Sequence, residues 1–299
     1  MPNWSEVLKE IQQYAKDNPG GDNPLDAIRR KYLTQTANHT GRNTIAYYSG
    51  WLQTPGSQNT AVSDKDKSAF MTTIHGMDRS LGLDLILHTP GGDLAATEGI
   101  VDYLRAMFGK NIRAIIPQLS MSAGTMIALS CKEIVMGKQS NLGPIDPQMG
   151  GVACQAVIQE FKKAKKDIAN NPASAPLWQV IIGKYHPTFI GSCKNAIKWS
   201  ETLAKDWLLD NMLENDPDKL QAIMKEFGDH KTSRSHARHI SLQKCKDLGL
   251  AIIEMEDDGD LQDLVLSTHH SYMHTFGSTT AVKIVENQNG VAFIESEKR

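Results

Sequence analysis

Strand and helix patterns alternate with short links through the first half of the chain, and this alternation constrains the fold more than any other feature. The alternating segments are, in order, Leu83–His88, Leu94–Phe108, Ile112–Pro117, Ser122–Ser130 and Glu133–Met136. The first of them is a nearly continuous apolar run, which is typical of a parallel strand covered on both faces. Repeated strand–helix units favour right-handed crossovers. We therefore predict an α/β fold built on a parallel sheet.

Helical segments flank and interrupt this region. Apolar residues recur at helical spacing on both sides of a Pro-Gly-Gly break near residue 20, which predicts an N-terminal helical extension over residues 1–40. The remaining residues, 41–299, are expected to form the main domain, with a helical insertion at about residues 152–230. The end of the chain is predicted to be a β-hairpin around Asn289-Gly290, a pair of residues that favours tight turns.

Residues 44–82 are predicted to form a strand and then a helix. Thr44–Ser49 is rich in aromatic and β-branched residues, as strands are. Ser63 and Asp66 have the spacing of a helix N-terminus, and the apolar stripe that follows extends to Leu81. We expect this helix to end at Gly82.

Composition excludes several classes of partner. The 299 residues include 40% hydrophobic side chains, and 32 basic and 34 acidic residues give a formal charge of -2. Such a balance creates no field that would gather nucleic acid or anionic lipid. No signal peptide is recognisable, and charged residues interrupt the most apolar stretch, Ile112–Met136. The four cysteines are widely spaced without a CxxC pair, which favours a reduced compartment. We expect a cytoplasmic protein that binds neither nucleic acid nor membrane.

Two strand-to-helix junctions carry the residues with the clearest chemical potential. One is HTPGGD, residues 88–93, and the other is SMSAGT, residues 120–125. Both follow parallel strands, and ligands bind at the carboxyl ends of such strands. Gly91 and Gly92 have no side chains, so their backbone N–H groups can approach a ligand closely. Ser122 stands among small residues, which leaves space for a substrate carbonyl. Together, the junctions predict a hydrolytic site.

Three motifs are similar to those of a known enzyme family. The runs LDLILHTPGGD, PQLSMSAGTMIALS and NLGPIDPQMGG resemble the serine dehydrogenase proteinase family, whose relatives include the Clp protease subunit and signal peptide peptidase A. The resemblance covers most of the chain from Gly41 onward. It implies a ClpP/crotonase-like fold and a serine peptidase that hydrolyses peptide bonds without a cofactor. It also implies that Ser122 is the nucleophile and that Gly91, Gly92 and Ala123 supply oxyanion-hole amides. Proteases of this fold commonly assemble, so the resemblance further implies a homo-oligomer.

The general base is less clearly marked. A serine hydroxyl becomes a good nucleophile only when a neighbour takes its proton. At the place where the Clp subunit has its histidine, this chain has Asp146, and the later segment SHARHISLQKCKDLGL offers His236 and His239. We therefore expect a triad of Ser122, His236 and Asp146, with the last two roles exchanged in chain order. The alternative is a Ser-Lys dyad that uses a desolvated lysine, with these candidates: Lys138, Lys162, Lys163, Lys165 and Lys166.

Four further polar residues are given structural roles. His270 and His274 are one helical turn apart, but no third ligand accompanies them, so we predict no metal site. Asp93 is expected to cap a helix, and His88 is expected to pack beside the site. Two other functions remain open. An acyl-coenzyme A enzyme of the crotonase type would use the same amides without Ser122, and a non-catalytic scaffold would keep the fold without the base.

Overall fold

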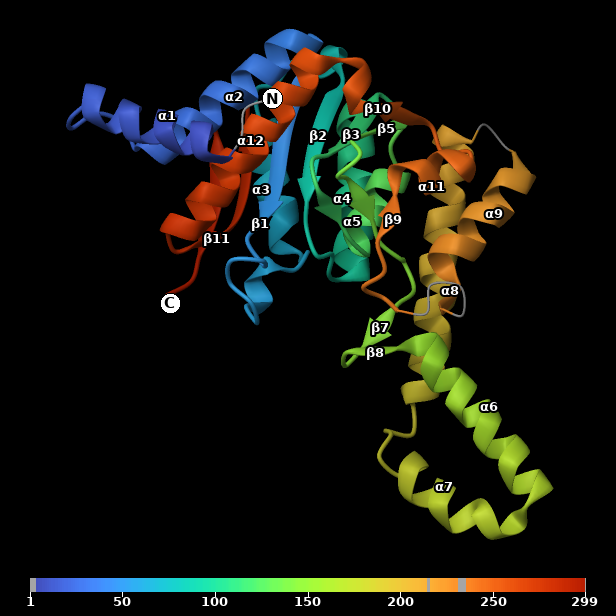
Figure 1. Cartoon of the computed structure of the whole chain (residues 1–299). Helices are drawn as coiled ribbons and strands as arrows, with labels where there is room; N and C mark the ends of the chain where they lie inside the picture. The colour runs from blue at the N-terminus through green and yellow to red at the C-terminus, as the bar shows by residue number, and fades with distance from the viewer. Residues whose placement is uncertain (1–3, 214–215, 231–234, 299) are drawn as a thin grey trace.

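A seven-stranded sheet forms the centre of the protein, whose computed structural model describes residues 4–213, 216–230 and 235–298 (Figure 1). The strands lie in the order β10-β5-β3-β2-β1-β11-β12. In chain order they are β1 (Asn43–Ser49), β2 (Leu83–His88), β3 (Ile112–Ile116), β5 (Glu133–Met136), β10 (Ile252–Glu254), β11 (Ala281–Asn287) and β12 (Ala292–Ser296). Adjacent pairs from β1 to β10 are parallel, and β11 and β12 add an antiparallel edge. The predicted α/β fold and C-terminal hairpin are confirmed.

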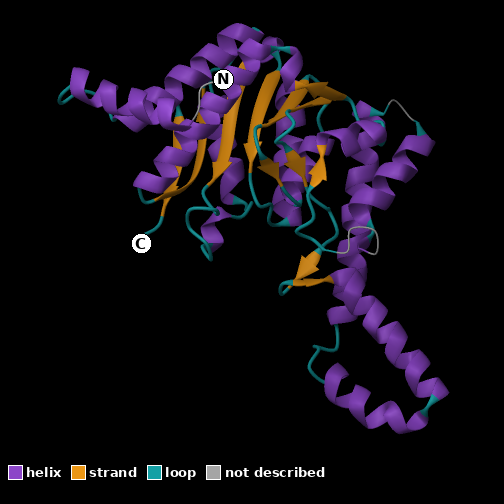
Figure 2. Ribbon diagram, in the orientation of Figure 1, coloured by secondary structure: helices purple, strands orange, loops and turns teal. Residues whose placement is uncertain are grey.

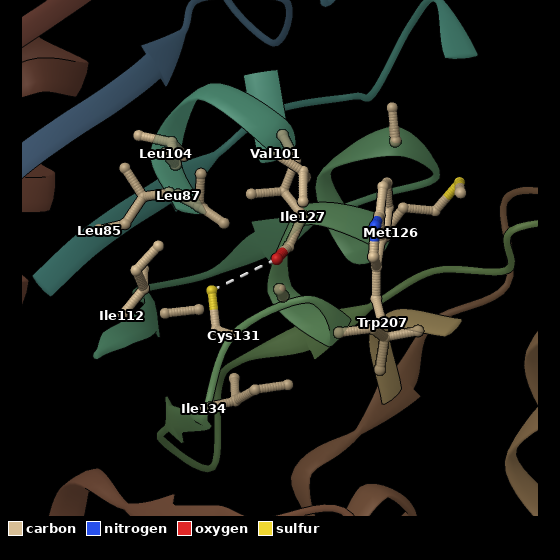
Figure 3. Close-up of a cluster of buried hydrophobic side chains, with 14 of the residues drawn as sticks. Leu85, Leu87, Val101, Leu104, Ile112, Met126, Ile127, Cys131, Ile134 and Trp207 are labelled. Atoms are coloured by element: carbon tan, nitrogen blue, oxygen red, sulfur yellow. Dashed lines mark hydrogen bonds between the residues drawn. The ribbon is translucent and has the colours of Figure 1, made fainter. Parts of the chain in front are cut away.

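Helices cover both faces of this sheet. Successive side chains of each strand point to opposite faces, so the sheet contributes to a buried core on each side. On one face, Ile45 and Tyr47 of β1 share a core with α3 (Lys65–Ile74), α4 (Leu94–Phe108) and α5 (Ala123–Leu129). On the other face, Ala46 and Tyr48 pack under α2 (Pro24–Thr40) and α12 (Gly259–Ser278). Figure 3 shows the first core, where side chains from β2, α4 and α5 meet around Cys131. The apolar runs in the sequence are therefore strands that are buried on both sides.

The N-terminal helices are attached to this framework. After α1 (Trp4–Asp17), Pro24 begins α2, and the Asn23 side chain accepts a hydrogen bond from the Leu25 N–H. Arg29 of α2 is fully buried, and its Nε donates to Glu286 Oε2 of β11 at 3.0 Å. A buried charge needs such a partner. The first forty residues thus contribute directly to the packing of the sheet.

The helix predicted to extend to Gly82 is shorter than expected. α3 ends at Ile74, and Leu81 belongs to a separate short 3-10 turn, Arg79–Leu81. The chain leaves helical geometry at His75, whose ψ is 127°, and Gly76 follows with a φ of +79°, a left-handed conformation that glycine adopts readily. The apolar periodicity continues past this residue, so it could not indicate the break.

The helical middle projects away from the sheet as an arm (Figure 2). It contains α6 (Cys154–Asn170), α7 (Ala175–Ile182) and the N-terminal part of α8 (Phe189–Trp207), whose C-terminal part packs in the core of the body through Leu203, Ala204 and Trp207. α9 (Pro217–Gly228) follows nearer the sheet. α6 and α8 pack together through Cys154, Val157 and Cys193. A short hairpin of β7 (Gln148–Met149) and β8 (Val152–Ala153) leads from the body into the arm. Among the helices of the described ranges, none has the length and apolar character needed to cross a membrane.

A buried ion pair joins α3 to the antiparallel edge. Lys283 of β11 is 1% exposed and Asp66 of α3 is not exposed, and Lys283 Nζ lies 2.9 Å from Asp66 Oδ1. Lys283 also donates to the Ala61 carbonyl at 2.6 Å, and Tyr47 Oη donates to Asp66 Oδ2 at 2.8 Å. The pair therefore holds residues 61 and 66 against the sheet.

Lys283→Met should destabilise the protein strongly, because it leaves the Asp66 carboxylate buried without its cation. We expect the free energy of unfolding, measured by urea denaturation, to fall by about 3–5 kcal/mol. Adding Asp66→Asn should recover part of this loss. The control is Lys65→Met, which removes an exposed cation from the neighbouring pair with Glu295 and should change stability little. Equal losses of unfolding free energy in Lys283→Met and Lys65→Met would contradict a special contribution of the buried Lys283–Asp66 pair.

Candidate functional site

The two strand-to-helix junctions are joined by backbone hydrogen bonds. The Thr89 N–H donates to the Leu119 carbonyl at 3.1 Å, and the Met121 N–H donates to the Thr89 carbonyl at 3.0 Å. These bonds bind the end of β2 to β4 (Leu119–Ser120), the short strand before the second junction. A methyl group placed on Gly91 would lie only 2.7 Å from Ser122 Cβ. The predicted meeting of the two junctions is thus present, and it requires a glycine at position 91.

Ser122 has an unusual backbone conformation. Its φ is 51° and its ψ is −114°, and no other non-glycine residue in the described part of the chain has a positive φ. Such a conformation costs an L-residue roughly 1–3 kcal/mol and tends to occur at functional sites. The turn places Ser122 directly before α5, with its side chain half-buried at the end of a sharp strand-to-helix connection.

The backbone N–H groups of Gly91, Gly92 and Ala123 are the predicted oxyanion-hole donors, and their surroundings differ. The Gly91 N–H donates to Thr89 Oγ1 at 3.2 Å. Gly92 forms a parallel bridge with Val62 that uses the Gly91 carbonyl and the Asp93 N–H, so the Gly92 N–H points away from Val62. Ala123 is the first residue of α5, where a helix has no internal acceptor for the N–H. The bridge with Val62 and the hydrogen bonds inside α5 therefore do not use the N–H groups of Gly92 and Ala123, which makes these two groups candidates for binding a ligand oxygen.

Ser122 lines a cleft with a volume of about 810 Å³. Its wall is formed by residues of the two junctions, of the loop that follows β1, of β7 and of α8. It is largely apolar, and its larger apolar side chains are Trp51, Leu94, Met126, Ile145, Met149 and Trp199. Trp199 of α8 is tied to α4 by a 3.0 Å hydrogen bond from its Nε1 to Glu98 Oε2. His236 and both candidate amides, Gly92 and Ala123, also line this cleft.

Asp146 and His236 are in direct contact. His236 Nδ1 lies 2.8 Å from Asp146 Oδ1, and the carboxylate is 1% exposed behind the imidazole. The contact follows from an antiparallel pairing of β6 (Asn141–Leu142) with β9 (Ile240–Ser241), in which Leu142 is opposite Ile240. Asp146 lies four residues after Leu142 and His236 four residues before Ile240, so the same register brings them together.

The segment that carries Asp146 is held from several sides. The Gly143 N–H donates to Thr125 Oγ1 of α5 at 2.9 Å. The Ile145 N–H donates to the Phe227 carbonyl at 2.8 Å, and Ser200 Oγ of α8 donates to the Ile145 carbonyl at 3.0 Å. This segment is therefore positioned by α5, α8 and the end of α9.

A second histidine, which the sequence did not indicate, also contacts Asp146. His230 Nδ1 lies 3.0 Å from Asp146 Oδ2 and is about as exposed as His236, at 21% against 22%. His230 lies just after α9, outside the motifs that carry the family resemblance. The position of His230, a few residues before the SHARH run, does not predict a contact with Asp146, because only the folded chain brings the two side chains together.

The family to which this chain belongs follows from a match to a protein-family model. Residues 60–265 match the model of the ClpP-like SDH-type serine proteinases, and this range includes both junctions, Asp146, His230 and His236. The chain belongs to this family of serine proteinases. The resemblance inferred from the three motifs is thereby confirmed.

Two uncharacterized proteins of Methanocaldococcus jannaschii are similar to this proteinase-family chain. They are 27% and 26% identical over 191 residues, which cover 64% of this chain and 60% and 59% of theirs. The chain thus spans about 60% of the length of these relatives. A solved structure of a mutant of the 1510-N membrane-bound stomatin-specific protease aligns with 15% identity and a TM-score of 0.38 over 68% of this chain and 79% of that chain.

The other candidate bases lie apart from the cleft. Lys138 follows β5, is exposed, and is not among the described residues that line the cleft. Lys162, Lys163, Lys165 and Lys166 are exposed on α6 of the arm, where a lysine is not desolvated. His239 is also exposed. Within the described ranges, the structure gives no hydrogen bond between Ser122 and His236, although both face the same cleft. Catalytic hydrogen bonds often form only when substrate is bound.

His88 is packed beside the site, as expected. It is fully buried at the end of β2, and its ring lies 4.3 Å from that of Trp51, which lines the cleft. Burial, together with nearby His269, holds the pKa of His88 well below its usual range. Burial beside His270 likewise lowers the pKa of His269 to about 3. Both rings are therefore neutral at physiological pH and act as packing groups.

The remaining polar candidates have structural contacts. Asp93 Oδ1 accepts a hydrogen bond from the Ala96 N–H at 2.8 Å, so its capping role is confirmed. His274 donates from Nε2 to the Trp4 carbonyl at 3.0 Å, and the rings of His270 and His274 both pack against Trp4.

Gly91→Ala should destabilise the protein, because the new methyl group would lie 2.6 Å from the Met121 carbonyl oxygen and would force a residue with a φ of +92° into strain. We expect the free energy of unfolding to fall by about 2 kcal/mol or more. The matched control is Gly99→Ala in α4, where the nearest atom is Lys67 Nζ at 3.7 Å. That helical substitution should raise stability by up to about 1 kcal/mol. Urea denaturation of both variants measures the difference.

Proposed function

We propose that the protein is a serine peptidase in which Ser122 forms an acyl-enzyme with the carbonyl carbon of a peptide bond. The observation that carries this proposal is the combination of a strained Ser122 with His236 in one cleft, where His236 is backed by the buried carboxylate of Asp146. A nucleophile, a base and a group that orients the base are the minimum for this chemistry.

Acylation moves the Ser122 hydroxyl proton by way of His236 to the leaving amine, forms an ester C–O bond and breaks the peptide C–N bond. Ser122 Oγ attacks the peptide carbonyl while His236 Nε2 takes the hydroxyl proton. Asp146 accepts the Nδ1–H of His236, which selects the tautomer with a free Nε2 and stabilises the imidazolium that forms. The imidazolium then gives its proton to the leaving amine as the C–N bond breaks. Water, activated by the same imidazole, hydrolyses the ester and releases the carboxylate product.

The developing oxyanion is assigned to the backbone amides of Gly92 and Ala123. Both residues line the same cleft as Ser122, one from each junction. Removing one oxyanion-hole donor costs about 3–4 kcal/mol in a well-studied hydrolase. Gly91 contributes differently, since its N–H is directed to Thr89 Oγ1 and its lack of a side chain allows the close approach to Ser122.

The cleft wall favours peptide substrates over acyl-coenzyme A. None of the described residues that line the cleft is a lysine or arginine, the residues that would bind coenzyme phosphates. Its apolar side chains, with Trp51 and Trp199 prominent among them, suit peptides that present apolar residues beside the scissile bond. Assembly into a homo-oligomer and a cytoplasmic location remain predictions from the sequence.

Ser122→Ala should abolish covalent labelling by a fluorophosphonate probe, because no other side chain replaces the attacking oxygen. The labelled site in the wild-type protein is identified by mass spectrometry of its peptides. Ser122→Gly should be equally inactive but more stable than Ser122→Ala by up to about 1 kcal/mol, since glycine relieves the strain at a φ of 51° and loses part of this gain to chain entropy. Labelling that persists in either variant would refute the assignment. A wild-type protein that is never labelled would favour the non-catalytic scaffold.

His236→Gln should slow labelling of Ser122 by about 10² to 10⁴-fold, the usual contribution of a general base. Asp146→Asn should also slow it strongly, because an amide can stabilise the wrong tautomer of His236. His239→Gln and Lys138→Met serve as controls and should label at nearly the wild-type rate, since both side chains are exposed away from the cleft. Rapid labelling of His236→Gln, with a loss in Lys138→Met, would favour the Ser-Lys dyad instead.

A further inference from the structure

We propose that His230 is a positioning residue that fixes the Asp146 carboxylate for His236, an inference that rests on the proposed peptidase function. One carboxylate serves two imidazoles here. Asp146 Oδ1 faces His236 Nδ1 at 2.8 Å, and Asp146 Oδ2 faces His230 Nδ1 at 3.0 Å. The second contact gives His230 a role that neither the motifs nor the family relationship assigns.

The geometry of a carboxylate explains why a second donor matters. A carboxylate with one hydrogen-bonded oxygen can rotate about its Cβ–Cγ bond, and rotation moves the other oxygen away from its partner. Asp146 is 1% exposed, so solvent has almost no access to its second oxygen. A buried carboxylate oxygen without a donor is costly. With donors on both oxygens, Asp146 keeps a single orientation that aims Oδ1 at His236.

His230 is itself held by the arm. Its backbone N–H donates to Gln155 Oε1 at 2.9 Å, and Gln155 Nε2 donates to the Gly228 carbonyl at 2.6 Å. Gln155 lies in the first turn of α6. The preceding residue, Cys154, donates its N–H to the Pro147 carbonyl at 2.9 Å. The first turn of α6 thus contacts the chain on both sides of the Asp146–His230 pair and keeps the two segments in register.

The two histidines have different access to substrate. Among the described residues, those that line the cleft include His236 but not His230. His236 turns Nδ1 toward Asp146, so Nε2 is the ring nitrogen that remains to take the hydroxyl proton of Ser122. His230 therefore acts on the reaction through Asp146. Its removal should disturb the alignment of the base and leave substrate binding intact.

The test compares His230→Ala with His230→Asn. The amide nitrogen of asparagine can reach the place of imidazole Nδ1, so His230→Asn keeps a donor for Asp146 Oδ2, whereas His230→Ala removes it. With a fluorophosphonate probe, we expect His230→Ala to lower the maximal labelling rate of Ser122 by about 10- to 100-fold, the size of loss that a small misalignment produces. The probe concentration at half-maximal rate should stay unchanged. His230→Asn should restore most of the rate.

A second measurement reports on the base without any reaction. The Nδ1 proton of His236 in its bond to Asp146 should give a strongly deshielded resonance in spectra of histidine-labelled protein, assigned by its loss in His236→Gln. We expect His230→Ala to shift or broaden this resonance and His230→Asn to preserve it. The control is His186→Ala, which removes an exposed histidine from the arm and should change neither the rate nor the spectrum. Thermal midpoints confirm that each variant is folded.

Three results would overturn the proposal. A wild-type rate and an unchanged His236 resonance in His230→Ala would mean that Asp146 needs no second donor. Equal losses in His230→Ala and His230→Asn would mean that the donated hydrogen bond is not what His230 supplies. Rapid labelling of His236→Gln, with a loss in His230→Asn, would make His230 the base itself. If the wild-type protein is not labelled at Ser122, the peptidase assignment fails, and the resonance alone still decides whether His230 orients the pair.

Discussion

The site depends on the close approach between the loop at Gly91 and the turn at Ser122. Backbone hydrogen bonds from Thr89 to β4 bring the ends of two parallel strands together, and the absence of a side chain at Gly91 lets the two turns touch. This contact brings Ser122, Gly92 and Ala123 to the wall of one cleft. The strain stored at Ser122 is held in place by the same contact, because a strained residue persists only where its surroundings leave it no alternative.

A buried carboxylate organises the other half of the site. Asp146 lies between two imidazoles, and its segment is held by α5, α8 and the end of α9. The free-energy cost of burying the Asp146 charge is offset only while His230 and His236 remain in position to donate hydrogen bonds to it. The first turn of α6 contacts Pro147, next to Asp146, and the segment that carries His230, so the helical arm is physically connected to the carboxylate and to one of its two donors.

Much of the fold could be predicted because its signals are local. The apolar run of β2, the pattern of α4 and the turn at Asn289-Gly290 each depend on neighbouring residues, and each prediction was confirmed. The helix that begins near Ser63 was predicted too long, since its periodicity continues beyond the break at Gly76. Non-local contacts leave no such pattern, which is why His230 was missed.

The sequence by itself determined the parallel sheet, the two junctions that contain Gly91 and Ser122, and the family. These features depend on strand and helix periodicity and on short motifs, which residues close together in the chain are enough to define. It also indicated Asp146 and His236 through resemblance. Only the tertiary structure decided that they touch, through the register of β6 against β9, and that His230 shares the carboxylate. These residues are separated by about ninety positions in the chain, so their meeting depends on the packing of elements between them, which no local pattern encodes.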